Sequence, residues 1–107
     1  FRPQDYDELV SAVAAWISDE SGATGTYGDI STWDVTRVRS LNGLFRDATS
    51  FNGAIGGWDV ASVTNMCCVF ERATSFNQDL SGWDVSRGAC LVTCRFAINQ
   101  QFGHCPR

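Results

Sequence analysis

The feature that most constrains the fold of this chain is a sequence pattern that recurs at a fixed interval. The stretch SFNGAIGGWDV at residues 50–60 returns as SFNQDLSGWDV at residues 75–85, and Trp33, Trp58 and Trp83 are evenly spaced along the chain. We call the interval from Trp33 to Trp58, which equals that from Trp58 to Trp83, one period. A fixed period of this length is typical of chains built from stacked supersecondary units. We therefore predict an array of repeats in which each unit packs against the one before it.

Within one period the spacing of the apolar residues changes in character. Residues 30–35 place apolar side chains in a short stretch of strand-forming residues, and residues 38–48 place them at the spacings of a helix. Residues 63–73 repeat the second pattern. We expect an α/β solenoid of about three strand–helix repeats, each one period long, over residues 28–107, with an irregular last repeat.

Residues 1–27 are predicted to form an N-terminal capping helix and its lead-in. Asp5 followed three residues later by Glu8 is typical of a capping box at a helix start. Val13 and Trp16 then belong to one apolar stripe. A solenoid needs its first apolar face covered, and this helix would cover it.

The repeat WDVxxVxxMxxxFxxATSFNxxLxGWDV resembles that of the BspA-like leucine-rich-repeat family of surface proteins, written around GWDVSxVTNMxxMFxxAxxFNQDLS. SVTNM at residues 62–66 and SFNQDLSGWDVS at residues 75–86 are close copies of that pattern. The chain departs from it at Cys67 and Cys68 and after Arg87. The resemblance implies a short leucine-rich-repeat-like solenoid that serves adhesion or protein interaction on exported or surface proteins. It implies no enzymatic activity.

Aromatic residues that recur with the period are predicted to form the core. We call residues that stand one period apart a column. The alternative is that the Trp column forms a stacked platform that binds carbohydrate, but columns of Ile and Val flank it at the same period, which favours burial. The predicted core residues are Trp33, Trp58, Trp83, Phe45, Phe70, Phe96, Phe51, Phe76 and Phe102.

An aspartate follows each of the three tryptophans. We expect Asp34, Asp59 and Asp84 to cap the predicted helices by accepting backbone N–H bonds. The alternative is that these aspartates, lying on adjacent strands, bind a row of calcium ions. The sequence favours this less, because no second column of acidic residues supplies the further ligands that calcium needs.

Five cysteines in 107 residues favour an oxidising compartment. On this basis we expect an exported, cell-surface or organelle-lumen protein. Cys67 or Cys68 is a candidate for a disulfide with Cys90 or Cys94, which would stabilise the irregular last repeat. The odd number of cysteines leaves at least one of them unpaired, and the sequence does not decide the connectivity.

Catalytic and cofactor sites are not expected. The single histidine, His104, stands beside Cys105, and adjacent residues rarely present both side chains to one reacting centre. With Cys90 and Cys94 these two residues form a set of zinc-ligand types, but their spacing is not a familiar zinc pattern. We predict no enzyme, no metal and no cofactor.

The charge pattern narrows the class of partner. The net charge is −4 and all eight basic residues are arginine, which argues against nucleic acid or an anionic membrane as the main partner. No apolar run reaches the roughly 20 residues of a membrane-spanning helix. Because the repeated residues are explained by stacking, functional residues are expected in columns that vary, and the candidate partner contacts are Arg37, Arg39, Arg46 and Arg72.

The sequence therefore predicts a non-catalytic module that presents a repeat surface to another protein, in adhesion or another protein interaction, and that binds no small molecule. A structural or accessory subunit buried in a larger multi-protein assembly is the alternative. A calcium- or carbohydrate-binding module is the third hypothesis and rests on the Asp and Trp columns.

Overall fold

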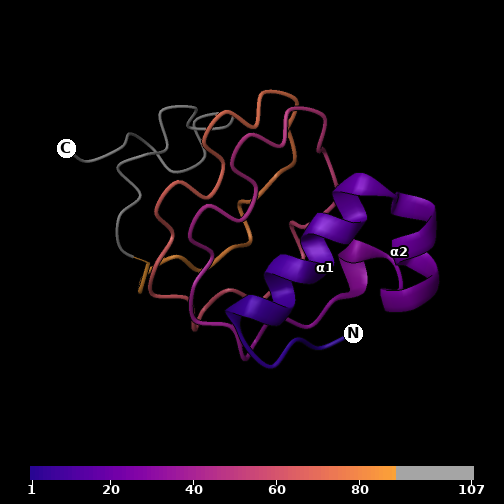
Figure 1. The fold of residues 1–107 in the computed structure, drawn as a ribbon. Helices are drawn as coiled ribbons and strands as arrows, with labels where there is room; N and C mark the ends of the chain where they lie inside the picture. The colour runs from indigo at the N-terminus through magenta and orange to yellow at the C-terminus, as the bar shows by residue number, and fades with distance from the viewer. Residues whose placement is uncertain (89–107) are drawn as a thin grey trace.

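The computed structural model describes residues 1–88 of the chain. The chain begins with two helices, α1 (Tyr6–Ser18) and α2 (Glu20–Tyr27), followed by the short 3-10 helix η1 (Ile30–Thr32). In Figure 1 the two helices lie together on one side of the coils that follow. The helices therefore cover one flank of the repetitive part of the chain.

Short side-chain caps define both helices. The Asp5 carboxylate accepts a hydrogen bond from the N–H of Glu8 at 3.0 Å, so α1 begins at the predicted N-cap. Asp19 ends α1, and its carboxylate accepts the N–H of Gly22 at 3.1 Å, which starts α2 at once. A single aspartate thus produces a sharp corner between the two helices.

From residue 33 to residue 88 the described chain contains no helix and no strand. Its one strand-like pairing is an isolated parallel bridge between Ser40 and Asn65. The predicted α/β, leucine-rich-repeat-like solenoid is therefore wrong. The strand expected at residues 30–35 is a 3-10 turn followed by extended backbone, and the helices expected at residues 38–48 and 63–73 are runs of turns.

Consecutive reverse turns explain why residues 38–48 imitate a helix in sequence. The N–H of Leu44 donates to the carbonyl of Leu41 at 3.0 Å, and that of Ala48 donates to Phe45 at 3.1 Å. Bonds between residues three apart bring apolar side chains to the inside at spacings of three, which a helix also produces. The spacing alone could not distinguish the two conformations.

Residues with positive φ are what exclude a helix here. Gly43 and Asp47 have φ of 62° and 61°, and the residues one period later, Cys68 and Arg72, both have φ of 60°. An α-helix cannot pass through this left-handed region. We call residues 30–54 the first segment and residues 55–79 the second; both bend at the same two columns.

The two segments lie side by side through a row of backbone hydrogen bonds. Alternate N–H groups of the first segment donate to carbonyls of the second, while the N–H groups between them close the turns. The inter-segment bonds are Leu41 to Asn65 at 2.8 Å, Gly43 to Cys67 at 2.8 Å, Phe45 to Val69 at 2.9 Å and Asp47 to Glu71 at 2.7 Å. This division gives these N–H groups partners without a regular strand or helix.

Aromatic stacks fill the space inside the coils. Phe45 stacks on Phe70 with ring centroids 5.6 Å apart, and Phe51 stacks on Phe76 at 5.8 Å. All seven predicted core aromatics within residues 1–88 are buried, namely Trp33, Phe45, Phe51, Trp58, Phe70, Phe76 and Trp83. Phe96 and Phe102 lie outside the described residues.

The buried tryptophans also tie each turn of the chain to the one before it. The indole N–H of Trp58 donates to the carbonyl of Ile30 at 2.8 Å, and that of Trp83 donates to Ile55 at 3.0 Å. A buried indole N–H needs such an acceptor. The Trp column therefore supplies both buried area and a directional contact between neighbouring coils.

None of the helices in residues 1–88 combines the length and apolar character needed to cross a bilayer.

Candidate interaction surface

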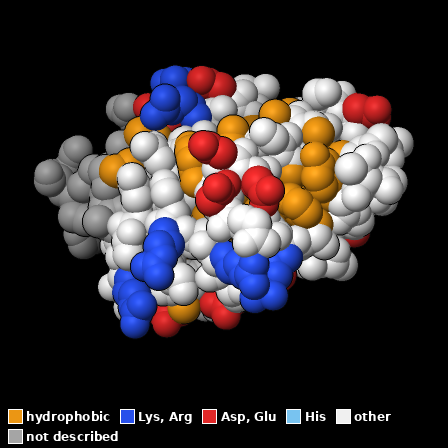
Figure 2. Space-filling model, turned by 60° about the horizontal axis from the view of Figure 1, so that its bottom comes forward, with side chains coloured by type: hydrophobic (Ala, Val, Ile, Leu, Met, Phe, Trp, Pro, Cys, Tyr) orange, Lys and Arg blue, Asp and Glu red, His pale blue; other side chains and the backbone are white. Residues whose placement is uncertain are grey.

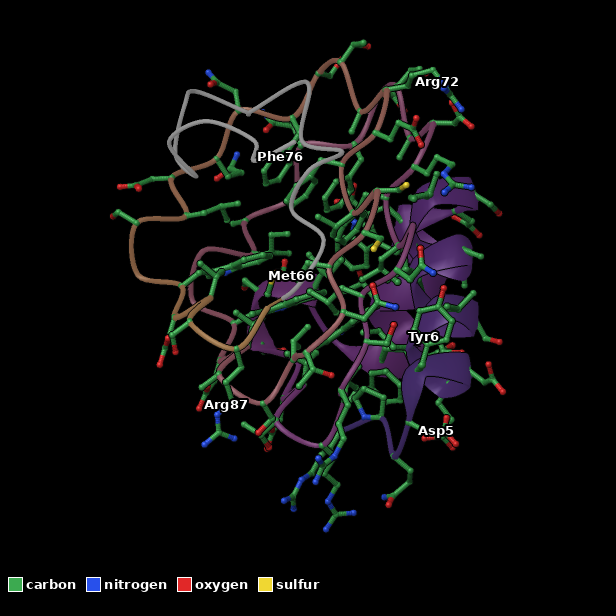
Figure 3. The ribbon with its side chains drawn as sticks, turned by 90° about the vertical axis from the view of Figure 1, so that its left-hand side faces the viewer. Asp5, Tyr6, Met66, Arg72, Phe76 and Arg87 are labelled. Atoms are coloured by element: carbon green, nitrogen blue, oxygen red, sulfur yellow. The ribbon has the colours of Figure 1, made fainter. Side chains whose placement is uncertain are left out.

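The arginine side chains form separate groups on the molecular surface. Figure 2 shows these groups on one face, with acidic side chains among them. Arg72 and Arg87 lie at opposite edges of the molecule (Figure 3). The predicted partner contacts fall into two pairs. Arg46 and Arg72 form ion pairs, whereas Arg37 and Arg39 form none with residues 1–88.

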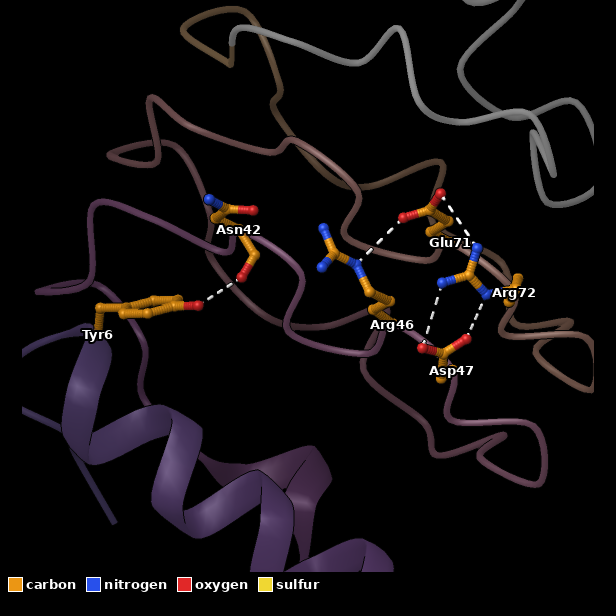
Figure 4. A network of polar contacts seen from close by, with 6 residues as sticks. All are labelled: Tyr6, Asn42, Arg46, Asp47, Glu71 and Arg72. Carbon is orange, nitrogen blue, oxygen red and sulfur yellow. Dashed lines mark hydrogen bonds and ion pairs between the residues drawn. The ribbon is translucent and has the colours of Figure 1, made fainter.

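Arg46, Asp47, Glu71 and Arg72 form a charge quartet that joins the two segments (Figure 4). The Nε of Arg46 lies 3.1 Å from Oε1 of Glu71. The Arg72 guanidinium donates to both carboxylate oxygens of Asp47, with 3.3 Å between Nη2 and Oδ2, and its Nη1 lies 3.4 Å from Oε2 of Glu71. Each arginine therefore faces an acid of the neighbouring segment.

The period explains the quartet. Glu71 stands one period after Arg46, and Arg72 stands one period after Asp47, so the order of charges is inverted between the segments. Sequence reasoning treated Arg46 and Arg72 as free partner contacts, although this inversion was visible in the sequence. The hydrogen bonds from Arg72 lower the pKa of Asp47, and the Asp47 carboxylate raises the pKa of Arg72.

One further contact connects α1 to the first segment next to the quartet. The hydroxyl of Tyr6, in the first turn of α1, donates to the backbone carbonyl of Asn42 (Figure 4). The contact gives this carbonyl a donor on the flank of the coils that α1 covers. It positions the helix against the coils and leaves the quartet facing solvent.

Arg37, Arg39 and Arg87, which we call the arginine edge, are all exposed and form no ion pair within residues 1–88. Arg39 follows buried Val38, and its carbonyl accepts the N–H of Thr64 at 2.8 Å, so its backbone is held in place. Arg37 donates only to the side chain of Gln4 within the described chain, at 2.6 Å. These guanidinium groups retain most of their donors for an external partner.

The aspartate column lies in the turns before these arginines and has a different role from the one predicted. Each carboxylate accepts the N–H two residues later: Asp34 from Thr36 at 3.0 Å, Asp59 from Ala61 at 3.1 Å and Asp84 from Ser86 at 3.0 Å. Because no helix follows any of them in the described chain, they close turns and do not cap helices. Within residues 1–88 no cluster of His, Cys, Asp and Glu is arranged to hold a metal ion.

Hydrogen bonds in two of these turns stabilise the ionised forms of Asp34 and Asp84. The Thr36 hydroxyl, followed by the Thr36 N–H, lowers the pKa of Asp34. The Ser86 hydroxyl and N–H lower the pKa of Asp84 in the same way. A general acid requires the opposite shift, so these carboxylates are suited to structure and binding and not to proton transfer.

The cysteine predictions fall mostly beyond the described residues. Cys67 and Cys68 are half-buried in the second segment, and the N–H of Cys67 donates to the side chain of Asn65 at 3.0 Å. No disulfide joins two cysteines of residues 1–88. Cys90 and Cys94, and with them the alternative zinc ligands, lie outside the described residues, so the cross-repeat disulfide stays a prediction.

Comparison with known proteins identifies one family. A family model described as "Mycoplasma protein of unknown function, DUF285" matches residues 17–102. No curated protein and no solved structure matches the chain. The matched range begins at the end of α1 and includes α2 and both segments.

Proposed function

Because the chain belongs to the DUF285 family, whose description assigns no activity, we propose its function from its surface: a non-catalytic module for adhesion or another protein interaction. The sequence resemblance to the repeats of BspA-like surface proteins supports the same class of function. The arginine edge is the proposed contact with the partner protein.

The observation that carries this proposal is the division between interior and surface. No polar or charged side chain is buried among residues 1–88. Catalytic groups usually depend on burial to shift their pKa values toward neutrality, and the interior offers none. The chemistry of the described chain is therefore at its surface, where recognition of another molecule takes place.

Arginine is well suited to such a contact. Its planar guanidinium binds carboxylates through two parallel hydrogen bonds, and arginine is enriched at protein interfaces. The members of the arginine edge form no ion pair with a carboxylate of the described chain, whereas the charge quartet contains several ion pairs. We expect a partner with exposed acidic side chains.

The test compares two double variants that change the net charge equally. The wild-type chain is used to capture partners from its native source, and the captured protein is then titrated with purified variants. Arg37→Ser with Arg39→Ser should weaken binding at least about tenfold, since two charge-assisted contacts are lost. Thr49→Glu with Thr74→Glu also changes the charge by −2, but at exposed positions away from the arginine edge, and should bind as the wild type does.

Equal binding by both double variants would contradict the arginine edge as the contact site, and the lack of any saturable protein partner would contradict the interaction module.

The proposed exported or surface location has its own test, because five cysteines favour an oxidising compartment. Thiol counting on the denatured, non-reduced native protein should find fewer than five thiols. Five free thiols would contradict an oxidising compartment.

A further inference from the structure

A pocket of about 410 Å³ lies where the end of α1 and the start of α2 meet the return loop of the first segment. The end of α1 contributes Trp16 and Ile17, and α2 contributes Glu20. Asp29 lies before η1, and Phe51 belongs to the return loop. Elements from three parts of the chain therefore build one concavity.

The floor and one wall of the pocket are apolar. Trp16 and Phe51 are buried, whereas Ile17 is 41% exposed. Among residues 1–88 the only other large hydrophobic side chain that is exposed is Phe1. The loop wall is close-packed, because a Cβ on Gly53 would come within 2.7 Å of the Phe51 ring. The pocket thus has a tightly packed loop wall and offers a solvent-facing apolar side chain, Ile17.

The charge of the pocket is negative. Glu20 and Asp29 are exposed at its rim, and none of the lining residues within residues 1–88 is an arginine or a histidine. Asp29 Oδ1 accepts from the N–H of Ser31 at 2.9 Å and from its hydroxyl at 2.8 Å, and these bonds lower the pKa of Asp29. Oδ2 of the same carboxylate has no partner within the described residues. The rim therefore presents carboxylate oxygens with no cationic side chain among the described residues that line the pocket.

We propose that this pocket binds a lysine or arginine side chain carried by an exposed segment of a partner protein. The aliphatic stem would lie along Ile17 and the apolar floor, and the cation would reach Glu20 and Asp29. Charge complementarity favours this occupant, since a cation would both donate hydrogen bonds to the two carboxylates and balance their charge, whereas a neutral saccharide would supply hydrogen bonds alone. The pocket shares no residue with the arginine edge, so either contact can fail while the other holds.

The experiment is an amide chemical-shift titration of the isotope-labelled full chain with the peptide acetyl-Leu-Arg-Gly-amide. The signals of Ile17, Glu20 and Gly53 should shift and saturate. The peptide with citrulline in place of arginine keeps the shape without the charge, and it should bind at least about tenfold more weakly. Binding of the arginine peptide should also weaken as salt is raised, because salt screens exposed charges.

A matched pair of variants separates the pocket from general charge effects. Glu20→Gln with Asp29→Asn should weaken the arginine peptide about tenfold, and the remaining oxygen of the new amide can still accept from Ser31. Asp7→Asn with Asp59→Asn changes one first-turn helix acid and one turn aspartate outside the pocket, and should leave binding unchanged. The spectrum of each variant away from the mutated sites reports whether the fold is kept.

Three results would overturn the proposal. The arginine peptide could cause no saturable shift, or the citrulline peptide could bind equally well, which would leave only an apolar contact. A disaccharide such as maltose could shift the same signals when the arginine peptide does not, which would identify a saccharide site. Failure of the peptide titration alone would leave the proposed function standing on the arginine edge.

Discussion

The first and second segments can be compared position by position, because each residue of one has a counterpart one period later in the other. Their buried columns agree: Phe45 and Phe51 of the first segment correspond to Phe70 and Phe76 of the second, and all four are buried. Their exposed columns differ, most clearly in the charge quartet, where the order of charges is inverted. The interior is repeated, and the surface varies.

The backbone follows the interior and not the exposed residue types. The left-handed position occupied by Gly43 in the first segment is occupied by Cys68 in the second, and that of Asp47 is occupied by Arg72. Glycine suits such a conformation, whereas a side chain with a Cβ is strained in it. The second segment adopts the same turns nonetheless, which shows that packing of the buried columns dominates local preference.

The largest expected effect tests whether the buried columns are equivalent. Phe45 is fully buried and stacks on Phe51 with centroids 4.3 Å apart, and Phe70 stacks on Phe76 at 4.5 Å. Phe45→Ala and Phe70→Ala should each lower the free energy of unfolding by about 3–5 kcal/mol. Urea denaturation followed by tryptophan fluorescence measures both, and Phe45→Leu, which keeps most of the volume, serves as the milder control.

A loss below about 1 kcal/mol for either alanine variant would contradict the stacked core. A large loss of unfolding free energy for Phe45→Ala but not for Phe70→Ala would instead show that the two segments are not equivalent. It would mean that the second segment is held mainly by contacts other than its aromatic stack.

The next prediction concerns the closest approach between the coils. A Cβ on Gly56 would lie 2.4 Å from the carbonyl oxygen of Asp79, which is backbone and cannot move away cheaply. Gly56→Ala should therefore destabilise the chain by about 1–3 kcal/mol. Gly57→Ala is the matched control, because nothing lies within 4 Å of a Cβ there, and it should change stability by less than about 0.5 kcal/mol. Equal effects in thermal or urea unfolding would contradict the close contact at position 56.

A smaller effect is expected from exchanging residue types at one left-handed column. Gly43→Ala should destabilise by about 1 kcal/mol, since φ of 62° is strained for alanine even though its Cβ would make only ordinary contacts with the Arg46 guanidinium, at 3.6 Å and beyond. Cys68→Gly should stabilise by about 0.5–1 kcal/mol, because it relieves the same strain. Urea denaturation with the protein reduced throughout measures both variants. Destabilisation by Cys68→Gly would show that contacts of the Cys68 side chain outweigh the strain.

The sequence predicted the interior better than the secondary structure. The Trp and Phe columns were readable because burial recurs with the period, and the start of α1 was readable from Asp5. The turns were not, because apolar residues three apart fit both a helix and consecutive turns. The residue types of Cys68 and Arg72 do not predict a positive φ, and Asp47 gives only the weak signal that aspartate is enriched in the left-handed region.

The candidate sites divide in a similar way. The charge quartet was missed although its inverted charges stand one period apart, because arginines in varied columns were treated as free. The acidic pocket could not be predicted, because it forms only when Ile17 and Glu20 meet the return loop that carries Phe51. Contacts along the period are readable from a repetitive sequence, and contacts between the helices and the coils are not.

The smallest expected effect tests the surface side of the comparison through pH. Asp47→Asn removes the charge that pairs with Arg72, and asparagine tolerates the positive φ at this position. The pKa of Asp47 is lowered in the folded chain, so its contribution to stability is present above the unfolded pKa of about 3.9 and is lost as the pH falls through and below that value. Thermal unfolding should therefore show the wild type slightly more stable than Asp47→Asn at pH 7, and this difference should shrink as the pH is lowered below about 3.9.

The control for this last prediction removes the other partner. Arg72→Gln should lose the same small increment at pH 7, and the double variant should be no less stable than either single variant, because exposed partners are worth little once their pair is gone. The increment should also shrink in high salt. A difference between wild type and Asp47→Asn that stayed constant from pH 7 to pH 3 would mean that position 47 acts through its backbone. The inverted charges would then not contribute to the pairing of the segments.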